Sequence, residues 1–91
     1  HETARIRDFQ EEGFQIWALE QTDQAVPLQN WRPDLASPTL IVLGNEVNGV
    51  SPSLLNQCQG ALEIPQFGTK HSFNVSVSTG ILLWEYIRRF C

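Results

Sequence analysis

The sequence contains no methionine, and it has only two cysteines and two histidines. Cys58 and Cys91 are too few for a disulfide framework or a four-cysteine zinc site. With His1 and His71 as the remaining histidines, we expect no structural metal, and the few cysteines fit a reducing cytoplasm. A chain without methionine that begins with His also suggests a start inside a longer protein. We therefore expect the C-terminal portion of a single domain over residues 1–91.

Long apolar runs and an excess of positive charge are also missing. Apolar residues make up 42% of the 91 residues, but no unbroken run exceeds four. A membrane-spanning helix needs about 20, so we expect no membrane segment. The formal net charge of −4 argues against an extended nucleic-acid surface on this chain. Residues 65–91 differ, because Lys70, Arg88 and Arg89 outnumber Glu85 there, and this end can face phosphate.

Predicted strands and helices alternate along the chain. Residues 14–19 and 39–43 are apolar at nearly every position, which is typical of strands buried on both faces. Such alternation favours an α/β fold, a mostly parallel sheet with helices on both faces. The remaining predictions are a strand over 61–64, a helical turn near 28–31, and helices over 4–12 (with Thr3 as N-cap), 52–58 and 74–90.

The segment Gly44–Ser51 follows the second predicted strand. Ligands of parallel sheets bind beyond the carboxyl ends of the strands, so this loop is a candidate site. Gly44 permits either a sharp turn or the close approach of a ligand, and Glu46 can bond a hydroxyl or an arginine. A turn with a solvated acid explains the same residues. The loop lacks the glycine and lysine spacing of a P-loop and the G-x-G-x-x-G fingerprint.

The segment Ile64–Asn74 follows the third predicted strand and leads into the last helix. Ser72 or Asn74 can cap that helix, or can hold a polar ligand together with the free amides beside them. Lys70 and His71 either meet phosphate or form solvated surface. A catalytic triad is not supported, because His71 has no acidic partner nearby and Cys58 falls in a predicted helix.

These loops together resemble known motifs. Residues 40–50, LIVLGNEVNGV, resemble the second motif of the SpoU/TrmH branch of the SPOUT RNA methyltransferases, and 64–85, IPQFGTKHSFNVSVSTGILLWE, resemble the third. Gln66 and Phe73 replace the commoner methionine and leucine. The resemblance implies a C-terminal trefoil knot in the α/β fold, although chains generally avoid knots.

The resemblance also implies S-adenosyl-L-methionine as cofactor and no metal. Glu46 would organise the site, while Ser72 and Asn74 would orient the ribose, the phosphate or a catalytic arginine. That arginine belongs to a first motif, N-x-G-x-x-x-R, which this chain does not contain. The implied cofactor-binding residues are Leu43, Gly44, Ile64, Gln66 and Phe73.

The activity implied is 2′-O-methylation of ribose in RNA. The sequence 20–22, Glu-Gln-Thr, taken with 70–72, Lys-His-Ser, resembles the tRNA-guanosine branch of this family more than the ribosomal branch, which implies tRNA as substrate. The resemblance further implies a homodimer, in which the last helix packs through the face carrying Val77, Ile81, Trp84 and Ile87. A non-catalytic knotted module for cofactor binding or dimerisation remains the alternative, and a flavodoxin-like nucleotide-binding domain ranks below it.

Overall fold

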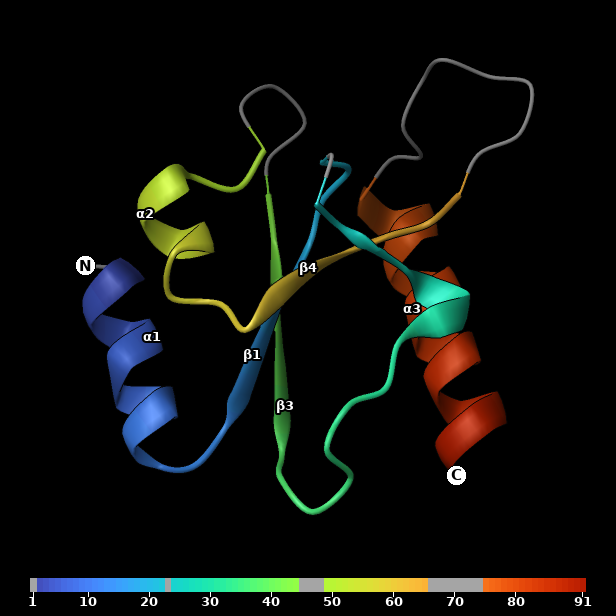
Figure 1. Cartoon of the computed structure of the whole chain (residues 1–91), viewed down its shortest axis with the longest axis horizontal. Helices are drawn as coiled ribbons and strands as arrows, with labels where there is room; N and C mark the ends of the chain where they lie inside the picture. The colour runs from blue at the N-terminus through green and yellow to red at the C-terminus, as the bar shows by residue number, and fades with distance from the viewer. Residues whose placement is uncertain (1, 23, 45–48, 66–74) are drawn as a thin grey trace.

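The computed structural model describes residues 2–22, 24–44, 49–65 and 75–91. Within these residues the strands form one parallel sheet in the order β2-β4-β1-β3 (Figure 1). This arrangement confirms the predicted α/β class. The elements are α1 (Glu2–Glu11), β1 (Gln15–Leu19), β2 (Val26–Pro27), the 3-10 helix η1 (Leu28–Asn30), β3 (Thr39–Leu43), α2 (Pro52–Leu55), β4 (Gly60–Glu63) and α3 (Val75–Phe90).

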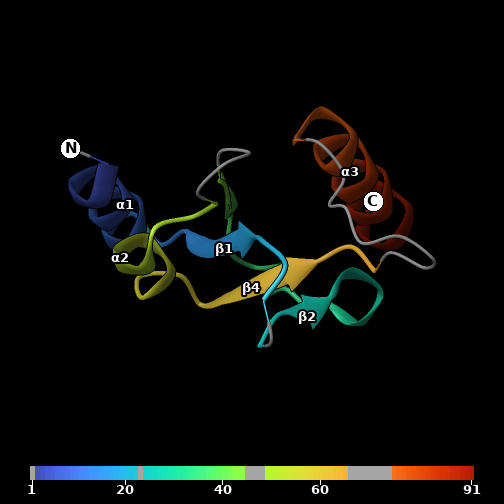
Figure 2. The same cartoon turned by 90° about the horizontal axis from the view of Figure 1, so that it is seen from above.

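Helices cover both faces of the sheet, as Figures 1 and 2 show: α1 and α2 lie on one side, and α3 with η1 on the other. Strand β1 supplies side chains to both cores, because successive residues of a strand point to opposite faces. Ile16 and Ala18 are buried beneath α1 and α2, whereas Trp17 and Leu19 pack into the cluster under α3. The prediction of a strand buried on both faces is therefore confirmed for β1.

Strand β3 has the predicted bounds but not the predicted burial. It pairs with β1 and forms one edge of the sheet, so its residues are only partly covered. Leu43, at its end, is 41% exposed. The opposite edge is β2, which pairs with β4 and was not predicted. Two residues including Pro27 carry too little periodicity to reveal a strand, but the helical turn that follows at Leu28–Asn30 is confirmed.

Two predicted helix ends are wrong by a few residues. Helix α1 begins at Glu2, so Thr3 lies within it rather than capping it. Ser51 does cap α2, with its Oγ accepting from the Leu54 amide at 3.3 Å. Helix α2 ends before Cys58, because the Cys58 amide donates to the residue three positions back, the Leu55 carbonyl, at 3.1 Å. This hydrogen bond over three residues forms a tighter turn than the α-helix, and the turn leads into β4.

Helix α3 packs on the sheet through a face other than the one predicted for the homodimer interface. Leu82 is buried in the cluster with Leu28, Trp31 and Leu62, and Ile81 is half-buried beside them. Trp84 and Ile87 of the face predicted for the homodimer interface are 65% and 52% exposed in the single chain. Spacing alone cannot show which of two apolar stripes faces the sheet. Of the helices described, none is long and apolar enough to cross a membrane.

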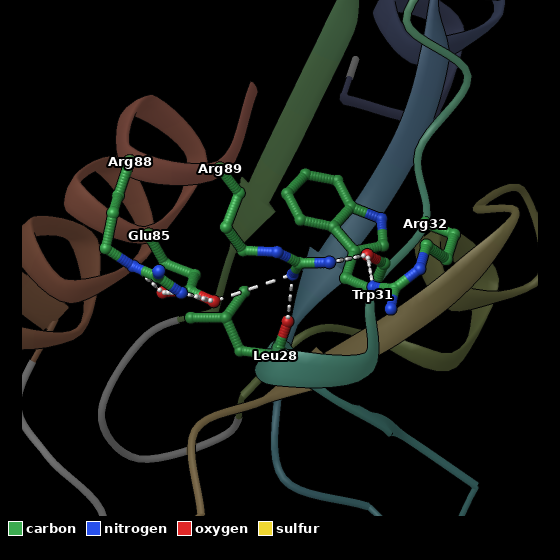
Figure 3. A network of polar contacts seen from close by, with 6 residues as sticks. All are labelled: Leu28, Trp31, Arg32, Glu85, Arg88 and Arg89. Carbon is green, nitrogen blue, oxygen red and sulfur yellow. Dashed lines mark hydrogen bonds and ion pairs between the residues drawn. The ribbon is translucent and has the colours of Figure 1, made fainter. Parts of the chain in front are cut away.

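A largely covered arginine attaches the end of α3 to η1. Arg89 donates from Nη1 to the Leu28 carbonyl at 3.0 Å and from Nη2 to the Trp31 carbonyl at 2.8 Å (Figure 3). Its Nη1 also lies 3.5 Å from Oε2 of Glu85, one turn earlier on α3. The indole of Trp31 packs beside these contacts, with its ring centroid 5.8 Å from that of Tyr86. The contact orients α3 because two carbonyls from a separate segment meet one rigid guanidinium.

Candidate functional site

The carboxyl ends of β1, β3 and β4 together form one edge of the sheet, which is distinct from the edges formed by the outer strands β2 and β3. Leu19 of β1 pairs with Leu43 on one side and with Leu62 on the other. With strands about 4.8 Å apart, those two leucines are separated by about 10 Å. Because β1 lies between β3 and β4 (Figure 1), Gly44 and Ile64, which follow β3 and β4, leave the same edge on either side of β1. The prediction that two loops depart from a common edge is confirmed for these described residues.

Gly44 is pressed against the other end of its own loop. A Cβ added to Gly44 would collide with the carbonyl carbon of Gly49 and would lie 2.5 Å from the amide nitrogen of Val50. Side-chain carbons do not approach backbone this closely, so only glycine fits. Of the two interpretations of Gly44, the sharp turn is thus supported by contacts within the chain. The turn also seats Val50 in the core with Ile16 and Leu54.

Glu20 was missed as a site residue from the sequence. It follows β1 directly, and its amide donates to the Leu62 carbonyl at 2.9 Å, which extends the pairing with β4. Its side chain lies on the opposite side of β1, toward the chain that follows β3, and its Oε1 accepts a hydrogen bond from the Val50 amide at 3.0 Å. Gly49 adopts a φ of +68°, and a Cβ there would collide with the same Oε1. The sequence position of Glu20 could have indicated this role, because Glu20 directly follows β1 just as Gly44 follows β3 and Ile64 follows β4.

The second carboxylate oxygen of Glu20, Oε2, is buried and has no hydrogen-bond partner in the part of the chain that the structure describes. Buried carboxylate oxygens are normally hydrogen-bonded, since leaving one unpaired costs about 1–3 kcal/mol or more. An unpaired acceptor at the ligand-binding edge of a parallel sheet is a feature that a bound donor would satisfy.

Two other predicted cofactor contacts are described by the structure. Leu43 ends β3 with its side chain largely open to solvent, and Ile64 follows β4 half-buried against the cluster around Leu28 and Leu62. Both positions leave backbone groups at the edge where the loops begin. The predicted residues that lie outside the described ones are Glu46, Gln66, Ser72, Phe73 and Asn74.

Cys58 and metal ligation contribute little to this site. The Cys58 thiol is partly buried and donates to the Leu54 carbonyl at 3.2 Å. Burial raises the pKa of this thiol above its usual range, so it stays protonated at neutral pH and is a poor nucleophile. Within residues 2–22, 24–44, 49–65 and 75–91, no group of three or more His, Cys, Asp or Glu side chains is placed to hold a metal ion.

Comparison with known proteins finds relatives over almost the whole chain. A tRNA (guanosine(18)-2′-O)-methyltransferase of Aquifex aeolicus is 40% identical over 86 residues, which are 93% of this chain and 39% of that protein. The Saccharomyces cerevisiae protein of the same name is 35% identical, over 89% of this chain and 6% of its own length. An AdoMet-bound rRNA methyltransferase from Sinorhizobium meliloti superimposes with a TM-score of 0.83 and 27% identity, covering 97% of this chain and 33% of that one.

The chain thus spans less than half the length of each of these three proteins. The model of the SpoU rRNA Methylase family matches residues 2–84, from α1 into α3, and so takes in all four strands and the edge where Gly44, Glu20 and Ile64 meet. The resemblance inferred from two loop motifs therefore extends over the sheet that positions them, and the chain belongs to the SpoU rRNA Methylase family.

Proposed function

We propose that this chain supplies the cofactor side of an S-adenosylmethionine-dependent RNA 2′-O-ribose methyltransferase. The observation that carries the proposal is the meeting of Gly44 and Ile64 at one edge of a parallel sheet, on a fold that superimposes on an AdoMet-bound relative. Ligands of such sheets bind at this edge. The names of the two methyltransferase relatives support the reaction.

The described residues fit this cofactor. Gly44 and Ile64 offer backbone groups at the sheet edge, Leu43 offers an exposed apolar side chain, and the unpaired Oε2 of Glu20 offers an acceptor. S-adenosylmethionine, when bound, supplies a methyl group activated by the positive sulfur. Ser72 and Asn74 would orient the ribose hydroxyl toward that methyl, because in-line positioning supplies much of the rate of such a transfer.

We infer that the substrate is tRNA. The support is the tRNA named for both the bacterial and the yeast relative, with the Glu-Gln-Thr sequence at 20–22. A chain with net charge −4 needs a local basic region to hold RNA phosphates. Arg88 is the exposed basic side chain at the end of α3, although Glu85 pairs with it at 2.9 Å.

Replacing Asn74 with alanine tests the function. We expect methyl transfer to tRNA to fall about 100-fold while the protein stays folded, because lost orientation slows a positioned reaction without opening the core. The assay follows labelled methyl from S-adenosylmethionine into a tRNA transcript, and mass spectrometry identifies the 2′-O-methylated nucleoside. Asn56→Ala is the matched control, since Asn56 is exposed at the end of α2.

Full activity in the Asn74 variant would contradict the assignment of this residue. Wild-type protein that binds S-adenosylmethionine but methylates neither tRNA nor rRNA would instead support the alternative, a non-catalytic binding module. The two results are separable because cofactor binding is measured without RNA.

We also propose that α3 mediates a homodimer. Val77, Leu83, Trp84 and Ile87 are large apolar side chains exposed on this single helix. Covering a contiguous apolar area gains about 25 cal/mol per Å², so a second copy that buries the same face is favoured. The basic ends of two helices would also come together, which supports RNA binding by the pair.

Trp84→Glu is expected to convert a dimer into a folded monomer. A charge placed in the centre of an apolar interface must be desolvated, which weakens association about 100-fold or more. Analytical ultracentrifugation measures the change. Leu35→Glu is the control, because Leu35 is 60% exposed but lies in the segment before β3. A dimer that survives Trp84→Glu would place the interface elsewhere.

We propose, finally, that the chain carries the trefoil knot implied by its motifs. The support is the strand order, in which β4, the last strand, lies between β1 and β2, which precede it in the sequence. A crystal structure that traces residues 44–75 continuously would decide this.

A further inference from the structure

Glu20 connects the two sides of the candidate site. Its backbone amide is bonded to Leu62 of β4, and its carboxylate is bonded to the Val50 amide on the far side of β1. It therefore lies between the segment that follows β3 and the one that follows β4.

The carboxylate holds the Gly49–Val50 backbone beside Gly44. Oε1 holds the Val50 amide, and Gly49 has no Cβ, which leaves room for this oxygen. Gly44 in turn packs on the Gly49–Val50 backbone. Loss of the carboxylate would remove the acceptor that keeps this turn closed, and the position of Gly44 would no longer be defined.

The other oxygen is left for a ligand. Among the described residues Oε2 is buried without a hydrogen-bond partner, and a buried carboxylate oxygen requires a donor. No lysine, arginine or histidine is recorded in contact with it within the described part of the chain. A nucleoside ligand carries suitable donors, namely ribose hydroxyls and amino groups.

We propose that Glu20 is a positioning residue of the methyl-transfer site: its Oε1 holds the Val50 amide against which Gly44 packs, and its Oε2 accepts a hydrogen bond from a hydroxyl or amino group of the bound nucleoside. This inference rests on the proposed function. The donor belongs either to S-adenosylmethionine or to the RNA, and the experiment separates the two.

Two substitutions of Glu20 distinguish the role of Oε1 from the role of Oε2. Glu20→Gln retains an oxygen for the Val50 amide and places an amino group where Oε2 stood, so a donor meets a donor. We expect it to weaken S-adenosylmethionine binding about tenfold, the effect of losing one hydrogen bond to a charged group. Glu20→Ala removes both contacts, and we expect a loss of about 30-fold or more. Calorimetric titration of the cofactor into the whole protein gives both values.

Gln59→Ala is the matched control. Gln59 Oε1 accepts from the Ile16 amide at 2.9 Å, which is the same kind of bond at the opposite end of β1. This variant should lower the melting temperature about as much as Glu20→Ala but leave the cofactor dissociation constant within about twofold of wild type. A purely structural role for Glu20 would make the two variants alike in both measurements.

The remaining outcomes are distinct. Glu20→Gln with wild-type cofactor affinity but a KM for tRNA raised about tenfold supports the proposal and assigns the donor to the RNA. Wild-type values for both quantities in Glu20→Gln overturn the role of Oε2, and this variant decides even if Glu20→Ala fails to fold. A wild-type protein that binds no S-adenosylmethionine contradicts the proposed function and this inference with it.

Discussion

Gly44→Ala is expected to eliminate measurable S-adenosylmethionine binding. The new Cβ would lie 2.5 Å from the Val50 nitrogen and would overlap the Gly49 carbonyl carbon, and neither is a flexible side-chain end that can move aside. The turn must therefore open, which displaces Val50 from the core and moves the end of β3 away from Glu20. Calorimetric titration should detect no saturable binding at cofactor concentrations 100 times the wild-type dissociation constant.

Gly80→Ala is the control for that substitution. A Cβ on Gly80 meets nothing within 4 Å, and alanine in a helix is about 1 kcal/mol more favourable than glycine. We expect this variant to bind the cofactor normally and to be no less stable than wild type. Circular dichroism of the Gly44 variant should retain the wild-type helix signal. Wild-type cofactor affinity in Gly44→Ala would show that the closed turn is not required for binding.

Arg89→Met is expected to destabilise the protein by about 3 kcal/mol, because it removes two charge-assisted hydrogen bonds that are largely shielded from solvent. The Arg89 side chain is 14% exposed and contacts the carbonyls of Leu28 and Trp31 (Figure 3). A domain of this size has a total stability of about 5–10 kcal/mol, so the loss is a large fraction of it. Urea unfolding monitored by tryptophan fluorescence measures the change.

Arg88→Met is the control for the Arg89 substitution. Arg88 also pairs with Glu85, at 2.9 Å, but its side chain is 55% exposed. Exposed pairs of this kind contribute about 0–1 kcal/mol, so Arg88→Met should be close to neutral. Equal losses in the two variants would show that charge at the end of α3, and not attachment to η1, determines the effect.

Much of the secondary structure could be predicted from residue patterns. Strands β1 and β3 and the start of α2 at Ser51 follow from apolar runs and a capping residue, which act locally. The ends of α1 and α2 differ by a few residues. Strand β2 was missed because its pairing with Leu62 and Glu63 comes from a partner distant in the sequence.

The candidate site could be predicted only where a motif marked it. Gly44 and Ile64 were identified from the loops in which they lie, and the sheet brings both to one edge. Glu20 was not identified as a site residue, because its position at the end of a strand does not show what its side chain contacts. Its importance arises from the bond to Val50, thirty residues further along the chain.

By itself, the sequence determined the parallel α/β class, most strand and helix positions, and the loops with family motifs, because periodicity, caps and glycine spacing are local properties. Only the tertiary structure decided the strand order, the placement of Glu20 between Leu62 and Val50, and the face of α3 that packs on the sheet. These features depend on which distant segments compete for the same surface. Apolar side chains lie on more than one side of α3, and the attachment of Arg89 to η1 orients the helix so that Leu82 is buried and Trp84 is exposed.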